Sequence, residues 1–204
     1  MEDVMLHIKI HRSVLRSQLR WNVDVSLNSG VCHRLAAPNG AGKTSFFEEL
    51  KLHWSELFPT HLLGFSDQAL LVPFQDLTVE AVMDVLWDVV PERRIQADWR
   101  ALSWWQENAV KSWWPRKISL LSGGENQWVK ILMMRSLVSD AWMMDEPFQS
   151  LDHKRQSELW VLLQEWLAAG KYLLLVHHGE VALQPLQSWT LQPSEQGLSL
   201  RAMS

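Results

Sequence analysis

The chain has 204 residues, of which 47% are hydrophobic and 21% are charged. These proportions are typical of a soluble globular chain that is long enough to bury one sizeable core. A formal net charge of −4 leaves no basic excess, which a dedicated nucleic-acid binder normally carries, so nucleic acid is not an expected partner.

Cysteine content and hydropathy limit the cellular environments that suit the chain. Cys32 is the only cysteine, which excludes an intrachain disulfide and a cysteine-rich zinc site and fits a reducing cytoplasm. No stretch approaches the roughly 18 apolar residues of a membrane span. We therefore expect any contact with a membrane to go through another chain.

The first third of the chain predicts three strands followed by a helix. Apolar residues alternate over residues 6–10 and again over 21–27, which is the pattern of two antiparallel strands. Residues 31–36 predict a short third strand, and residues 44–57 predict a helix. A glycine-containing loop separates this strand from this helix.

That loop, APNGAGKTS, matches the phosphate-binding pattern G-x-x-x-x-G-K-[ST] at every place except the first, where Ala37 stands for glycine. Gly40 and Gly42 let backbone N–H groups curl around phosphates. Lys43 places a positive charge on the β and γ oxygens, and the Thr44 hydroxyl can bind Mg²⁺. Alanine avoids only the left-handed backbone region, so Ala37 weakens the match without forbidding the loop.

Residues 78–114 carry apolar side chains at helical spacing with one break at Pro91, which predicts a helical insertion. This segment also contains tryptophans that suit either core packing or an exposed docking patch. Adjacent helical residues point about 100° apart, so we expect one tryptophan of each adjacent pair to be exposed. The tryptophans concerned are Trp87, Trp99, the pair Trp104 and Trp105, and the pair Trp113 and Trp114.

A second glycine loop lies in LLSGGENQ, where a helix is predicted to begin at Gly123. A glycine pair at the start of a helix indicates that something, often a phosphate, approaches the backbone closely. One nucleotide hardly needs both glycine loops of the same molecule. The second loop therefore calls for a separate explanation.

The last third of the chain predicts buried parallel strands and therefore an α/β fold. An apolar run over 142–144 ends in Asp145 and Glu146, at the strand end where Mg²⁺ needs a carboxylate. Asp145 would hold the metal, and Glu146 would act as general base toward the attacking water. A helix over 156–168 and a strand over 172–176 follow, and the remaining residues favour a hairpin.

In this order, the stretches APNGAGKTS, LSGGENQ, MMDEP, SLD and LVHHGE resemble the nucleotide-binding subunit of an ABC transporter. The resemblance covers nearly the whole chain. It implies an α/β P-loop NTPase (RecA-like) core with an N-terminal antiparallel β subdomain and a helical insertion. It also implies one domain over residues 1–204, divided into 1–68, 69–120 and 121–204, with ATP and Mg²⁺ as cofactors.

The resemblance assigns roles to individual residues. Glu146 becomes the catalytic base, and the metal-binding residues are Thr44, Gln68 and Asp145. The histidine that contacts the reacting phosphate is His177 or His178, and the family pattern favours His178. Residues implied in nucleotide binding are Asn39, Gly40, Ala41, Gly42, Lys43, Thr44 and Ser45 and, toward a second subunit, Ser122, Gly123, Gly124 and Asp152.

Three features depart from the family pattern. Gln68 and Gln75 are both candidates for the glutamine that leads into the insertion, and Gln68 is preferred because it lies ten residues before Thr78. Residues 7–20 contain no aromatic side chain for stacking on adenine. Trp128 occupies a position where a basic residue usually follows the signature glutamine.

The resemblance answers the question that the second glycine loop raises. In this family the LSGG loop faces the γ-phosphate held by another subunit, so the two loops serve two nucleotides. We expect a head-to-tail dimer with a second copy or a related ABC subunit. We also expect a permease on a separate chain, which would place this chain on the cytoplasmic face of the membrane. The alternative is a permease-independent ABC ATPase with a mechanical or regulatory role.

Overall fold

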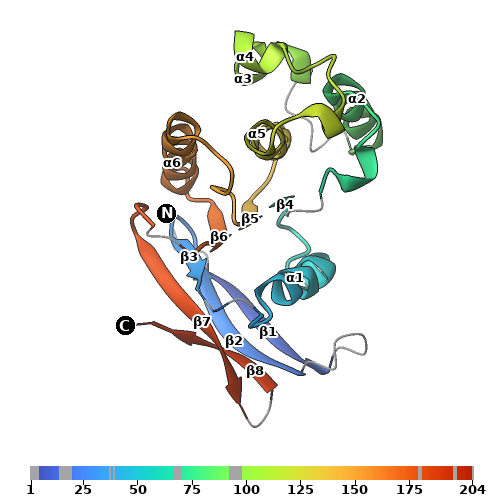
Figure 1. Ribbon diagram of the computed structural model, residues 1–204. Coiled ribbons are helices and arrows are strands. Elements are labelled where there is room, and N and C mark those ends of the chain that lie inside the picture. Colours follow the sequence, from blue (N-terminus) through green and yellow to red (C-terminus); the bar gives the residue numbers. More distant parts are fainter. Residues whose placement is uncertain are drawn as a thin grey trace.

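A computed structural model describes residues 5–13, 20–36, 38, 40–66, 70–91, 98–178, 181–194 and 197–203. Within these residues, eight strands form a single sheet in the order β1-β2-β8-β7-β3-β6-β5-β4 (Figure 1). The strands are β1 (Met5–Ser13), β2 (Arg20–Asn28), β3 (Cys32–Leu35), β4 (Leu63–Ser66), β5 (Ala141–Asp145), β6 (Tyr172–Val176), β7 (Leu186–Ser194) and β8 (Gly197–Ala202).

Parallel strands make up the half of the sheet at which the phosphate loop and Asp145 lie. The strands β7, β3, β6, β5 and β4 pair in parallel with their neighbours. On the other side, β1 and β2 form the predicted antiparallel pair, and the predicted C-terminal hairpin is β7 with β8. One register pair, Trp21 with Leu198, joins β2 to β8. The antiparallel pair is thus continuous with the parallel strands in one α/β sheet.

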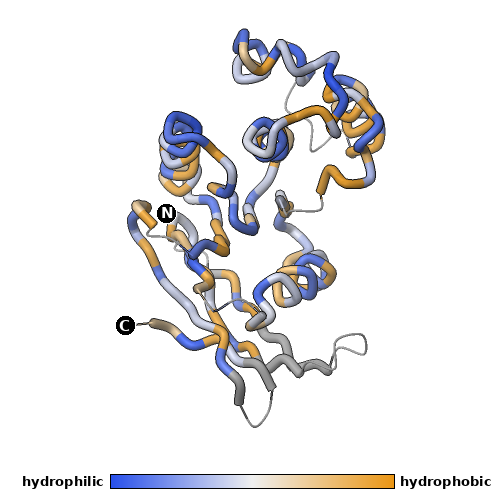
Figure 2. The backbone as a smooth tube through the Cα atoms, in the orientation of Figure 1, coloured by the Kyte–Doolittle hydropathy of each residue, from blue (hydrophilic) through white to orange (hydrophobic). Residues whose placement is uncertain are grey.

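The two faces of the sheet are covered by different helices. Alternate residues of β5 point to opposite faces, so Trp142 and Met144 join one core cluster while Ala141 and Met143 join the other. The first cluster contains apolar residues of α5 (Gly123–Arg135) and α6 (His153–Ala168), and the second contains those of α1 (Lys43–Leu57). Figure 2 shows both hydrophobic and hydrophilic residues along these helices, and residues 128–134 of α5 are all buried.

The helical insertion lies beyond the edge of the sheet that β4 forms (Figure 1). Its longest helix, α2 (Val79–Val89), begins after Thr78, whose side chain accepts a hydrogen bond from the Ala81 N–H. The rest is short: η1 (Val72–Phe74), η3 (Trp99–Ala101), α3 (Ser103–Gln106), α4 (Asn108–Lys111) and η4 (Ile118–Leu120). Among the described residues, no helix is long and apolar enough to cross a membrane.

The prediction that one tryptophan of each adjacent pair is exposed is wrong. Trp105 and Trp113 are buried, while Trp104 and Trp114 are half-buried and pack against the first core cluster. The prediction assumed a regular helix, but Trp113 and Trp114 lie in a turn after α4. The ring of Trp99 contacts those of Trp105 and Trp114 at centroid distances of 5.4 and 4.8 Å. Packing therefore accounts for these side chains better than docking does.

Candidate nucleotide-hydrolysis site

The phosphate loop connects the end of β3 to the start of α1. Gly40 and Gly42 have φ angles of 77° and 91°, a left-handed conformation that glycine adopts without strain. Gly42 is the N-cap of α1, so the positive end of the helix faces the loop. The Lys43 ammonium group donates to the Pro38 carbonyl at 3.0 Å and thus lies across the loop. Ala37 and Asn39 lie outside the described residues.

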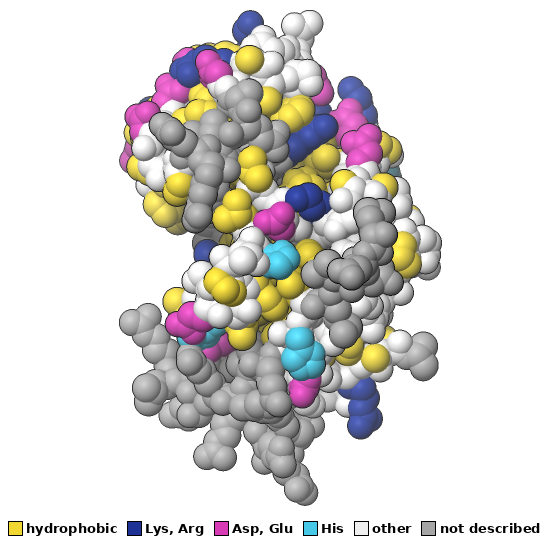
Figure 3. Space-filling model, turned by 180° about the vertical axis from the view of Figure 1, so that it is seen from behind, with side chains coloured by type: hydrophobic (Ala, Val, Ile, Leu, Met, Phe, Trp, Pro, Cys, Tyr) yellow, Lys and Arg dark blue, Asp and Glu magenta, His cyan; other side chains and the backbone are white. Residues whose placement is uncertain are grey.

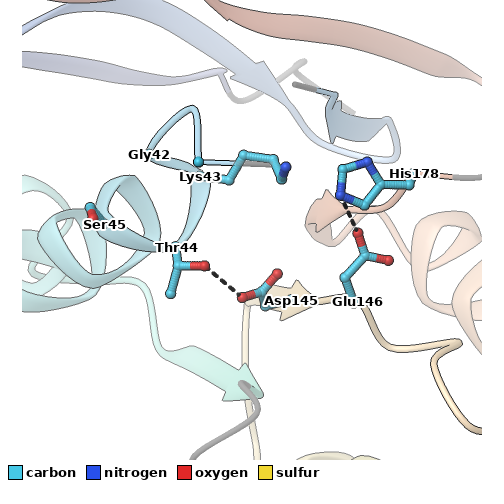
Figure 4. Close-up of a pocket in the computed structure, with 8 residues that line it drawn as sticks. Gly42, Lys43, Thr44, Ser45, Asp145, Glu146 and His178 are labelled. Atoms are coloured by element: carbon cyan, nitrogen blue, oxygen red, sulfur yellow. Dashed lines mark hydrogen bonds and ion pairs between the residues drawn. The ribbon is translucent and has the colours of Figure 1, made fainter. Parts of the chain in front are cut away.

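Two of the three predicted oxygen ligands for Mg²⁺ lie together. The Thr44 hydroxyl, from the first turn of α1, donates to Asp145 Oδ2 at 3.3 Å (Figure 4). Asp145 is buried at the end of β5, where it pairs with Val176 of β6. A hydroxyl and a carboxylate are hard oxygen donors of the kind that Mg²⁺ prefers, so the pair fits this ion.

Glu146 follows Asp145 with a φ of 48°, which turns the chain out of the strand. Its backbone N–H still donates to the Val176 carbonyl at 2.9 Å, so its side chain is held beside the end of β6. Residues in the left-handed region are uncommon unless they are glycine, and such strain concentrates at functional sites. The carboxylate that follows this turn points toward His178 at the side of the cavity, as Figure 4 shows.

Both candidate histidines contact Glu146. His177 Nδ1 lies 3.1 Å from Glu146 Oε2 in a hydrogen bond, and His178 Nε2 lies 3.4 Å from Oε1. The His177 side chain is 16% exposed and packs against the rings of Phe148 and Trp160, whereas that of His178 is 48% exposed. The structure thus brings to Glu146 both histidines that the sequence left as alternatives.

A cavity of about 320 Å³ collects these groups. It receives side chains from the phosphate loop, the end of β5 and the end of β6, which come from three distant parts of the sequence (Figure 4). Glu146 Oε1 is buried there and has no hydrogen bond from the described residues, although His178 Nε2 lies 3.4 Å from it, so it can accept one from a molecule in the cavity. The lining residues are Gly40, Gly42, Lys43, Thr44, Ser45, Asp145, Glu146 and His178.

The signature loop, which we define as Ser122, Gly123 and Gly124, borders a second cavity of about 420 Å³. Ser122 caps α5: its hydroxyl oxygen accepts from the Glu125 N–H, and its own N–H donates to Glu125 Oε2 at 2.7 Å. The Arg116 guanidinium, 2.7 Å from the Glu125 carboxylate, lowers the pKa of that carboxyl. Among the described residues, the two cavities share no lining residue.

The glycines of the signature loop have a packing role that the sequence did not reveal. A Cβ atom on Gly124 would lie 2.5 Å from the Ser150 carbonyl oxygen, which is closer than real Cβ contacts come. Ser150 itself has a φ of 64° in the loop between β5 and α6. Asp152 ends that loop and caps α6, because its carboxylate accepts from the Arg155 N–H at 2.8 Å. The signature loop and the loop that carries Asp152 are therefore in direct contact.

The two candidate glutamines lie in different settings. Gln68 lies outside the described residues. Gln75 follows η1, where its side-chain amide donates to the Leu71 carbonyl at 3.4 Å. Gln75 does not line the 320 Å³ cavity.

A parallel sheet with a phosphate loop at one strand end and Asp145 at another defines the chain as a P-loop NTPase domain. It is 33% identical over 182 residues to the zinc transport system ATP-binding protein TroB of Treponema pallidum, which covers 78% of this chain and 66% of TroB. It is also 27% identical over 184 residues to the zinc import ATP-binding protein ZnuC of Acinetobacter baylyi. This match covers 87% of this chain and 66% of ZnuC. No protein-family model matches the chain.

A solved structure of a metal-chelate type ABC transporter in an inward-facing conformation has the same fold. Its TM-score is 0.69 at 17% sequence identity, and the match covers 98% of this chain and 84% of that one. The chain belongs to the family of ABC transporter ATP-binding proteins. It spans about two thirds of the length of TroB and of ZnuC.

Proposed function

We propose that this chain binds and hydrolyses ATP and thereby powers a separate membrane permease. The observation that carries the proposal is the single cavity into which Lys43, Thr44, Asp145 and Glu146 all point. These side chains supply a phosphate contact, two metal ligands and a base within reach of one another. Relatives named as ATP-binding proteins of zinc transport systems support the link to transport.

In the proposed reaction, the loop amides and the Lys43 ammonium bind the β and γ phosphates of ATP. Mg²⁺, when bound by Thr44 and Asp145, neutralises charge on the phosphate oxygens. Water attacks the γ phosphorus while the bond to the bridging oxygen of ADP breaks. Glu146 Oε1, which makes the longer of the two histidine contacts, accepts the proton of that water, since Oε2 is hydrogen-bonded to His177 at 3.1 Å. His178, which lines the cavity, contacts the γ-phosphate.

The signature loop acts on a different nucleotide, held by a second copy of this chain or by a related ABC subunit. The two cavities have different described lining residues, which supports this division. The Ser122 hydroxyl, the loop amides and the positive end of α5 would complete the partner's site. The resulting dimer is head-to-tail with two equivalent sites, and hydrolysis removes the charge contacts that hold it closed.

The permease would dock on the helical insertion and hold the chain on the cytoplasmic face of the membrane. Val72, Leu77, Val85 and Val89 are exposed hydrophobic residues of η1, α2 and the turn between them. Figure 3, which shows the molecule from behind, has hydrophobic side chains gathered around a hollow in the surface. Exposed apolar groups in one region are typical of an interaction surface, and they replace the tryptophans as the expected contact.

Phosphate release from Mg-ATP by the purified chain tests the proposed activity. Lys43→Ala removes the charge that contacts the phosphates, so we expect loss of ATP binding and of hydrolysis. Lys51→Ala is the matched control, because Lys51 lies on the same helix but contacts the Phe65 ring instead of the cavity. Equal ATP affinity in the Lys43→Ala variant and the control would contradict the assignment of the cavity.

A further inference from the structure

Arg155, in the first turn of α6, lies where three parts of the molecule meet. Its guanidinium group lies over the ring of Trp128 in α5, with 4.8 Å to the ring centroid. It also lies over the ring of Trp113 from the helical insertion, at 5.7 Å. Its Nη1 atom is 3.4 Å from the carboxylate of Glu107, the residue between α3 and α4. One side chain thus contacts α5, α6 and the insertion.

The surroundings of Arg155 hold its side chain in one position. The side chain is 11% exposed, and Nη1 donates to Glu158 Oε2 at 2.7 Å. A planar guanidinium can stack on an aromatic face and form directed hydrogen bonds at the same time, which the ammonium group of lysine cannot do. Cation–π contacts also strengthen when water is excluded, as it is here by Trp128 and Trp113, both of which are buried.

Arg155 also belongs to the wall of the second cavity, together with Trp113, Asp152 and the signature loop. The backbone N–H of Arg155 donates to the Asp152 carboxylate. The position of Arg155 is therefore coupled to the loop before α6, which packs on Gly124. Trp128 occupies the place where the family pattern has a basic residue. In this chain the guanidinium group of Arg155, which belongs to α6, lies over the Trp128 ring and so places a positive charge beside position 128.

We propose that Arg155 is a positioning residue that holds the helical insertion and the signature loop in one arrangement. This arrangement keeps the second cavity in the shape that covers the nucleotide of a neighbouring subunit. The inference rests on the proposed two-subunit site. Arg155 does not contact the phosphate-loop cavity, so it acts on closure of the dimer and not on binding of ATP by the single subunit.

The test compares Arg155→Met with the unchanged chain. We expect kcat to fall about tenfold, which corresponds to about 1.4 kcal/mol and lies between the values for exposed and for desolvated cation–π contacts. The affinity of the single subunit for ATP should stay within about twofold, because the two cavities share no described lining residue. Arg155→Lys should restore only part of the activity, because it restores the charge without the planar group.

Two further variants make the test specific. Lys154→Met changes the neighbouring residue, whose side chain is 80% exposed and 3.6 Å from the same Glu158, so it should leave kcat unchanged. Glu107→Gln removes the ion pair with Arg155 and leaves the contact of Arg155 with the Trp113 ring, at an exposed position that does not threaten folding, so it should lower kcat by a smaller factor. If Arg155→Met fails to fold, a lower kcat in Glu107→Gln would support the role of Arg155, and an unchanged kcat in Glu107→Gln would contradict it.

ATP-driven dimerisation separates failure of this inference from failure of the proposed function. In a Glu146→Gln background, we expect Arg155→Met to weaken the ATP-dependent dimer. A Glu146→Gln chain that does not dimerise at all would contradict the shared site. Equal dimerisation with and without Arg155→Met, together with an unchanged kcat, would overturn only the role of Arg155.

Discussion

The carboxylate of Glu146 has two oxygens in different situations. Oε2 is bonded to His177, which is itself packed between Phe148 and Trp160, while Oε1 is buried without a hydrogen bond. Oε1 lies 3.4 Å from His178 Nε2, a longer contact than the one that Oε2 makes with His177, so Oε1 is the oxygen better able to accept from a water in the cavity. We infer that His177 fixes the direction of the base and that Oε1 takes the proton.

This division of roles predicts different effects for two substitutions at one position. His177→Ala should lower kcat by at least about tenfold with little change in KM, because the base loses its orientation. His177→Asn should recover much of the loss, since the amide nitrogen of Asn lies near the position of Nδ1. His53→Ala is a suitable control, because His53 pairs with Glu49 and Glu56 away from the cavity. An unchanged kcat in His177→Ala would contradict the role.

At the scale of elements, the centre of the sheet was predictable because its strands are continuous apolar runs. Residues 172–176 were predicted as a strand and form β6, and the run that ends at Asp145 forms β5. The phosphate loop, Asp145 and Glu146 followed from the same local patterns. A buried strand is recognised by a continuous run of apolar residues, and a phosphate loop is recognised by glycine, lysine and serine or threonine at fixed spacing.

Contacts between distant elements were not predictable. No local pattern shows that Ser150 approaches Gly124, that Arg155 reaches Trp113, or that one pair joins β2 to β8. The prediction of exposed tryptophans was wrong for the same reason, because helical spacing does not reveal turns such as the one at Trp113 and Trp114. The glutamine that leads into the insertion stays a prediction.

Strand β3 contains His33, a fully buried histidine that ties three strands together. Its Nδ1 accepts from the Trp189 indole N–H at 3.2 Å, so Nε2 carries the proton and donates to the Asn28 carbonyl at 3.4 Å. Burial disfavours the charged imidazolium and lowers the pKa of His33 from 6.5 to about 4. Between these two values the unfolded chain binds a proton that the folded chain does not.

The free energy of unfolding should therefore fall as the pH decreases from about 7 to about 4. The sign follows because the unfolded state gains the proton, and the loss is on the order of 3 kcal/mol. His33→Gln should flatten this pH dependence, whereas His7→Gln, at an exposed histidine paired with Asp24, should not. Denaturant unfolding at several pH values measures the difference. Identical pH dependence in the unchanged chain and His33→Gln would contradict the account.

On the scale of the whole molecule, the sheet separates two cores, and two of the cavities among the described residues hold the predicted site residues. The phosphate-loop cavity collects Lys43, Asp145 and Glu146, and the second cavity collects the signature loop and Arg155. A single ATP bound to the first cavity leaves the second one without a ligand. The account therefore predicts that ATP joins two subunits, each of which completes the other's site.

The most direct test of this claim is the mass of the Glu146→Gln variant in solution, measured by size-exclusion chromatography with light scattering. The substitution removes the base but none of the phosphate contacts, so ATP should bind and persist. We predict a dimer in saturating Mg-ATP and a monomer without nucleotide, and we predict a monomer in both conditions when Lys43→Ala is added. A Glu146→Gln chain that remains monomeric in saturating Mg-ATP would contradict the shared nucleotide site.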